Sequence, residues 1–165
     1  MKQYNIIIKP NLKSLNLIRD VEVKHLTRHK DERGFFEELI RISDPFFKEG
    51  FGQLSHSFMH MGVIKAWHIH KTQIDWWYVA KGHLHVALYD ARSDSQSCGI
   101  INTFELGEKG DNVILKIPPG VAHGCKVITQ TSELFYVTSK TYNPKEEGRI
   151  PHDDTKIGYD WLKSA

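Results

Sequence analysis

Residues 62–82 read GVIKAWHIHKTQIDWWYVAKG, and residues 117–124 read IPPGVAHG. The first stretch holds His68, His70 and Asp75 between two glycines, and the second holds His123. Side chains of a strand alternate between its two faces, so His68 and His70 project from one face if this stretch is a strand. Two imidazoles, a carboxylate and a distant histidine predict either a metal site or an acid/base site.

Strand signals separated by turns dominate the rest of the chain. Apolar residues alternate with other residues in segments 84–89, 113–117 and 134–138, which is the period of a half-buried strand. Glycine and proline mark turns between such segments, and a polar turn is expected over residues 28–32. Short strands separated by such turns predict an all-β sandwich, barrel or jelly roll. One short peripheral helix is expected over residues 44–49, with Asp44 as its cap and Pro45 at its first position.

The composition is that of an ordinary soluble globular chain of 165 residues, with 40% hydrophobic residues and a formal net charge of +2. This charge is too small to favour nucleic acid or an anionic membrane surface as a partner. Cys98 and Cys125 make no disulfide framework and are expected as free thiols in a reducing compartment. Residues 1–10 lack the features of a signal peptide, and no apolar run approaches the length of a membrane span. We therefore expect one domain over residues 1–165, located in the cytoplasm.

The histidine-rich stretch has three interpretations. In the first, His68, His70, Asp75 and His123 surround one divalent ion, because neutral imidazoles and a carboxylate suit such an ion. In the second, one imidazole exchanges a proton with a substrate and a second proton donor lies across from it. In the third, the histidines are hydrogen-bonded core or interface residues without a chemical role.

Further motifs occur along the chain in a fixed order. Residues 31–38 read DERGFFEE, residues 53–57 read QLSHS, and the segment 142–161 begins Tyr-Asn-Pro and ends Gly-Tyr-Asp-Trp. Together with residues 62–68 and 117–124, they resemble motifs of the dTDP-4-dehydrorhamnose 3,5-epimerase family, which belongs to the cupin superfamily. The resemblance extends over residues 20–161.

This resemblance implies a cupin jelly roll with a core over residues 20–141 and an irregular tail over residues 142–165. It implies a homodimeric isomerase that needs no cofactor and acts on a nucleotide-diphosphate 4-keto-6-deoxy sugar, the chemistry of deoxysugar and polysaccharide biosynthesis. The ketone acidifies the neighbouring C–H bonds, so a base can remove a proton from one face and an acid can return one to the other. A cation near the ketone oxygen would stabilise the enolate as its charge develops.

By motif position, the resemblance assigns roles to ten residues of this chain. His68 would be the base, Tyr142 the acid and Lys65 the cation near the ketone. Substrate-binding roles fall on Arg33, which would hold the diphosphate, on Phe36 and Glu38 at the nucleotide, and on Gln53, Ser55, His70 and His123.

Several positions depart from the epimerase pattern. His70 stands where the family has glutamine, and Asp75 stands where it has an active-site lysine. The chain ends before the segment expected to supply the aspartate that orients the base, and Asp75 or Glu133 could replace that carboxylate. The pair His68 and His70 instead resembles the dTDP-sugar 3,4-ketoisomerases. A 3,4-ketoisomerase, a metal-dependent cupin and a non-catalytic sugar-nucleotide binding module therefore remain alternative functions.

Overall fold

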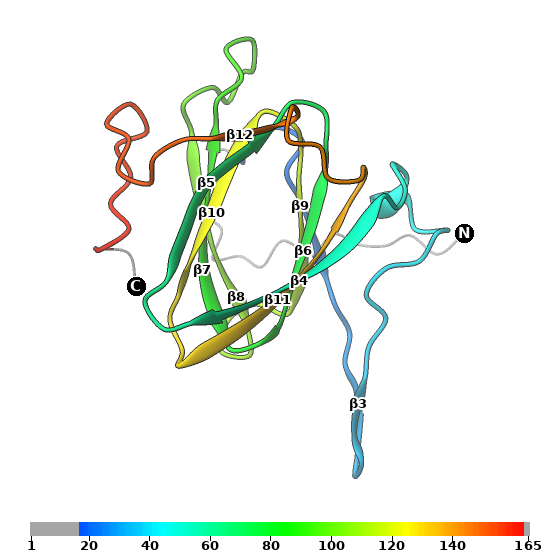
Figure 1. The fold of residues 1–165 in the computed structure, drawn as a ribbon. Coiled ribbons are helices and arrows are strands. Elements are labelled where there is room, and N and C mark those ends of the chain that lie inside the picture. The colour runs from blue at the N-terminus through cyan, green and yellow to red at the C-terminus, as the bar shows by residue number, and fades with distance from the viewer. Residues whose placement is uncertain (1–16, 164–165) are drawn as a thin grey trace.

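The computed structural model describes residues 17–163, so the ends of the predicted domain and residues 1–10 lie outside the described residues. The described chain is nearly all β, as expected (Figure 1). Its strands are β1 (Glu22–His25), β2 (His29–Asp31), β3 (Gly34–Phe36), β4 (Gln53–His60), β5 (Ile64–His70), β6 (Asp75–Lys81), β7 (His83–Asp90), β8 (Ile101–Gly107), β9 (Val113–Ile117), β10 (Val121–Val127), β11 (Thr131–Thr138) and β12 (Glu147–Arg149). None of the helices in this described part is long and apolar enough to cross a membrane.

Two five-stranded antiparallel sheets form the body of the domain. The first has the strand order β1-β9-β6-β11-β4, and the second has the order β12-β5-β10-β7-β8. Leu84, Val86 and Leu88, whose alternation predicted a strand, are fully buried in the main hydrophobic core. Leu115 of β9 and Leu134 of β11 belong to the same core, so side chains from both sheets fill the space between them.

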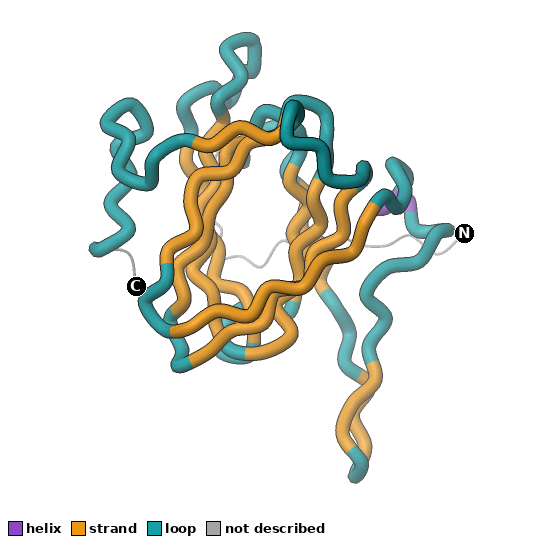
Figure 2. The backbone as a smooth tube through the Cα atoms, in the orientation of Figure 1, coloured by secondary structure: helices purple, strands orange, loops and turns teal. Residues whose placement is uncertain are grey.

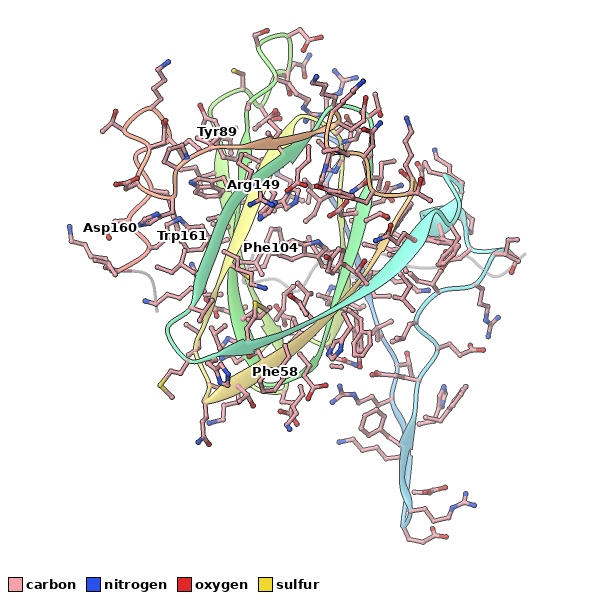
Figure 3. All side chains as sticks on the ribbon, in the orientation of Figure 1. Phe58, Tyr89, Phe104, Arg149, Asp160 and Trp161 are labelled. Atoms are coloured by element: carbon pink, nitrogen blue, oxygen red, sulfur yellow. The ribbon has the colours of Figure 1, made fainter. Side chains whose placement is uncertain are left out.

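A second apolar layer covers the opposite face of the second sheet. Ala87 on β7 and Ala122 on β10 pack with Trp67, Ile157 and Trp161. Figure 3 shows Trp161 on the outer side of this sheet, in the segment that follows β12. The C-terminal segment therefore buries the outer face of the strands whose inner face holds the core.

The tail differs from the irregular segment expected after residue 141, because it contains the strand β12. This strand adds to the edge of β5, with Arg149 opposite His68 and Glu147 opposite His70. Backbone pairing of this kind needs no apolar alternation, so the polar sequence gave no strand signal.

The segment before the first sheet also differs from expectation. Residues 29–31, predicted as part of a polar turn, form β2 and pair with β3 in a hairpin that projects from the barrel (Figure 2). The turn itself is shorter and lies at Glu32 and Arg33. The expected helix is a single 3₁₀ turn, η1 (Pro45–Phe47), capped by Asp44, whose Oδ1 accepts a hydrogen bond from Phe46 N at 3.0 Å.

Candidate active site

A cavity of about 380 Å³ lies between strands of the two sheets and the tail. This volume is within the range of small-molecule sites. Seven of the residues singled out from the sequence line it together: Gln53, Lys65, His68, His70, Asp75, His123 and Tyr142. The strands β4, β5, β6 and β10 and the tail supply them, so the fold gathers one cluster of polar side chains from segments far apart in the chain.

A register shift in β5 brings Lys65 and His68 to the same cavity. His123 pairs with His68, whereas Cys125, two residues later, pairs with Lys65, three residues earlier. This bulge changes the alternation of β5, which would otherwise place the side chains of Lys65 and His68 on opposite faces of the strand. Gly124 lies opposite the bulge, and a Cβ there would come within 2.4 Å of the Ala66 Cβ, so the close approach requires glycine.

His68 has a carboxylate partner that the sequence analysis did not identify. Its Nδ1 lies 2.8 Å from Oε1 of Glu147 on β12. Burial tends to raise the pKa of Glu147, but hydrogen bonds from His68 and Arg149 outweigh it and hold this pKa below its ordinary value. Asp75 and Glu133, the two carboxylates expected to orient His68, have other partners. Asp75 approaches His70 and His123, and Glu133 pairs with His56 and Lys81.

The inner wall of the cavity is built around the buried carboxylate of Asp75. Its Oδ1 accepts a hydrogen bond from Gln73 Nε2 at 2.8 Å, and its Oδ2 accepts one from Trp77 Nε1 at 3.3 Å. Oδ2 also lies 3.8 Å from His70 Nε2 and 3.7 Å from His123 Nε2. Asp75 thus faces two imidazole nitrogens but no lysine or arginine within ion-pair distance in the described part of the chain.

His123 is oriented by the backbone of its own strand. Its Nδ1 donates a hydrogen bond to Val121 O at 3.0 Å, which leaves Nε2 free to accept. Burial lowers the pKa of His123 to about 4, against the opposing influence of Asp75. His123 is therefore a neutral imidazole at neutral pH, with its lone pair directed toward Asp75.

Three donor groups meet here in a way that suits a metal ion. One atom each from His70, Asp75 and His123 lies within 4.8 Å of the others, whereas His68, the fourth member of the expected set, is not part of this group. Two imidazoles and one carboxylate suit first-row divalent ions such as Zn²⁺ or Fe²⁺. The backbone hydrogen bond of His123 is the kind that orients a metal-ligating histidine.

Tyr142 lies at the exposed side of the cavity, and 64% of its surface is accessible. Its backbone N–H donates to Gln53 Oε1 at 3.0 Å, and Gln53 Nε2 donates to Ser55 Oγ at 2.9 Å. Lys65 Nζ donates to Ser57 Oγ at 2.9 Å. The inward-facing side chains of β4 thus hold both the tail and the lysine in position.

Four expected substrate-binding residues do not line this cavity within the described chain. One is Ser55 on β4, which is hydrogen-bonded to Gln53 of the lining, and the other three lie in or near the projecting hairpin. Arg33 lies at the turn of the projecting hairpin, Phe36 on β3 is 63% exposed, and Glu38 follows β3 and forms an ion pair with Arg41. Figure 1 shows the hairpin extending away from the barrel, so one copy of the chain does not bring these residues to its own cavity.

Two facing antiparallel sheets with a histidine-lined cavity between them define a jelly roll of the cupin type. The chain belongs to the family described as dTDP-4-dehydrorhamnose 3,5-epimerase, whose model matches residues 16–165. The expected family and fold are therefore confirmed.

Individual relatives agree with this assignment. The chain is 46% identical over 149 residues to the spore coat polysaccharide biosynthesis protein SpsL of Bacillus subtilis, covering 88% of this chain and 97% of that protein. It is 38% identical to the probable low-salt glycan biosynthesis epimerase Agl13 of Haloferax volcanii, covering 87% and 94% of the two chains.

Solved structures match the fold closely. A dTDP sugar isomerase from Desulfovibrio desulfuricans G20 has a TM-score of 0.84 at 26% identity, covering 90% of this chain and 94% of that one. A dTDP-6-deoxy-D-glucose-3,5-epimerase from Legionella pneumophila, solved with dTDP-4-keto-L-rhamnose, has a TM-score of 0.79 at 25% identity, covering 88% and 80%.

Proposed function

We propose that this protein is an isomerase that epimerises a nucleotide-diphosphate 4-keto-6-deoxy sugar at a carbon next to the ketone. The observation that carries this proposal is that His68, Lys65 and Tyr142 line one cavity. A base, a cation and a phenol are the groups that proton removal, enolate stabilisation and reprotonation require. The family and the ligand named for the Legionella structure support the substrate class.

In the proposed reaction, His68 removes the proton from the carbon next to the ketone and becomes positively charged. The electron pair moves onto the ketone oxygen, where the ammonium group of Lys65 stabilises the developing negative charge. Tyr142 then donates a proton to the opposite face of the same carbon. The centre is inverted, and proton exchange with water restores the two side chains for the next turnover.

The position of the residues expected to bind the nucleotide end of the substrate supports a dimer. If Arg33, Phe36 and Glu38 hold the nucleotide and diphosphate, as their motif suggests, a second copy must supply them, because they lie outside the cavity of their own chain. Phe35 and Phe36 on the projecting hairpin are 53% and 63% exposed, and apolar exposure of this kind is typical of a contact surface. We infer a homodimer in which each hairpin reaches the partner's cavity.

A second candidate, metal-dependent chemistry, is favoured by the convergence of His70, Asp75 and His123. The donor set fits a first-row divalent ion, which could polarise a substrate oxygen in the same cavity. The proposed epimerase reaction needs no metal. Only the metal-dependent candidate predicts a bound ion that is lost when Asp75 is replaced.

We infer a role in surface polysaccharide biosynthesis, because the spore coat and glycan proteins are named for such pathways. A cytoplasmic location is consistent with Cys98 and Cys125, which are free thiols.

One experiment tests the reaction directly. Purified protein is incubated with dTDP-4-keto-6-deoxyglucose in deuterated water, and the sugar protons are followed by NMR. Deuterium entering at C3 or C5 with inversion supports the epimerase, whereas a ketone that moves to C3 supports a 3,4-ketoisomerase. Binding without any exchange would contradict both and favour a non-catalytic binding module.

A further inference from the structure

The carboxylate beside His68 comes from a strand that is firmly attached to β5. Just after β12, Trp67 N donates to Ile150 O at 2.9 Å and Ile150 N donates to Trp67 O at 3.0 Å. Just before β12, Lys71 N donates to Glu146 O at 3.2 Å. Backbone hydrogen bonds therefore fix β12 both before and after the residue that contacts His68.

Glycine allows this strand to lie close to β5. A Cβ at Gly148 would come within 2.8 Å of Ile69 Cγ2, which is closer than side chains tolerate. Only 12% of the Glu147 side chain is exposed, and its Oε1 lies 2.8 Å from His68 Nδ1. The contact is thus held by the fold rather than by two flexible surface groups.

This geometry has a direct chemical consequence for His68. A carboxylate can only accept a hydrogen bond, so the proton of the neutral imidazole resides on Nδ1 and the lone pair on Nε2. A base needs that lone pair available to the substrate, and a neighbouring negative charge stabilises the imidazolium that forms when the proton is taken.

We propose that Glu147 is a positioning residue, which fixes the tautomer and orientation of His68. This role rests on the proposed function, in which His68 is the base. The alternatives drawn from the sequence, Asp75 and Glu133, have other partners.

Arg149 offers a competing explanation for Glu147. Its Nε lies 3.2 Å from the same Oε1, so Glu147 could serve only to neutralise the arginine. The Arg149 side chain is 75% exposed, however, and ion pairs in water contribute little. Changing each partner of Glu147 separately distinguishes the two explanations.

The first measurement uses the full chain without substrate. Ring ¹⁵N shifts of His68, assigned by their loss in H68Q, report which ring nitrogen carries the proton. We expect the Nδ1–H tautomer in the wild type and in R149Q, and a larger share of Nε2–H in E147Q. An Nε2–H tautomer in the wild type, or an unchanged tautomer in E147Q, would overturn the proposal.

The second measurement is the rate of deuterium incorporation into dTDP-4-keto-6-deoxyglucose. E147Q should lower it roughly 10- to 100-fold, the range typical for loss of a group that orients a functional histidine. E147D should recover part of the rate, because it keeps the charge. E146Q, the matched control, removes a neighbouring carboxylate that accepts from Thr72 instead, and should keep the wild-type rate.

Equal rates for E147Q and the wild type would refute the positioning role. If the wild type itself exchanges no substrate proton, the proposed epimerase function fails, and the tautomer measurement still decides whether Glu147 positions His68.

Discussion

Oδ2 of Asp75 lies 3.7 Å from Nε2 of His123, and the hydrogen bond from His123 Nδ1 to Val121 O leaves both atoms as acceptors. Two facing acceptors lack a shared proton, and a cation between them would satisfy both. His70 Nε2 is a third acceptor beside them, because Gln73 Nε2 lies 3.3 Å from it and can only donate. The inner wall of the cavity therefore has the chemistry of a divalent-ion site.

The metal-dependent alternative predicts one transition-metal ion per chain. Tag-free protein dialysed against Zn²⁺ or Mn²⁺ should retain one equivalent by elemental analysis, and D75N and H70A should each lose it. H83A serves as the control, since His83 pairs with Glu105 away from this cavity. Equal metal content in D75N and the wild type would contradict the site.

Replacing Tyr142 by phenylalanine should separate proton removal from inversion. The phenol is the proposed acid, so Y142F keeps the base and can still remove the substrate proton. His68 can return a deuteron only to the face from which it took the proton. We expect deuterium incorporation to continue in Y142F while the inverted product falls at least about 100-fold, a typical contribution of a general acid. NMR of the sugar in deuterated water measures both, and full epimerase turnover would remove Tyr142 from the mechanism.

The sequence could predict the histidines of the cavity because they lie on short, strongly marked segments. His68 and His70 share a face by simple alternation, and His123 follows a Pro-Pro-Gly turn. The contact of His68 with Glu147 could not be predicted in this way, since 79 residues separate the two and β12 carries no apolar pattern. The bulge opposite Gly124, which brings Lys65 to the same cavity as His68, depends on packing between strands rather than on local sequence.

Acid should destabilise the fold partly through Asp90. This fully buried carboxyl at the end of β7 accepts hydrogen bonds from Arg92, Ser95 and Ser97. Burial opposes ionisation, but these hydrogen bonds outweigh it and hold the pKa of Asp90 well below its usual range.

Because that pKa is lower in the folded chain than the value of about 3.9 in the unfolded chain, the unfolded state takes up more protons in acid. The stabilisation is complete above about pH 5 and is lost as the pH falls below about 4. D90N should cost roughly 3 kcal/mol at neutral pH, and its difference from the wild type should shrink in acid. Urea unfolding of the wild type and D90N at neutral pH and below pH 4 measures this difference in stability. The control changes the exposed Asp94 to Asn. A difference between D90N and the wild type that does not depend on pH would contradict the argument.

A mixture of two inactive variants tests whether the hairpin of one copy completes the cavity of another. R33A lacks the proposed diphosphate-binding side chain, and H68N lacks the base, so each homodimer should lose most of its epimerase turnover, measured as inverted product. In a mixed dimer, one cavity combines His68 of one subunit with Arg33 of the other and is intact. Subunit exchange of equal amounts should therefore restore about one quarter of the wild-type rate, as expected for a two-fold symmetric dimer.

The matched control mixes H68N with Y142F, because both residues line the cavity of their own chain and no mixed dimer contains an intact site. No recovery in the first mixture would show that Arg33 serves its own subunit.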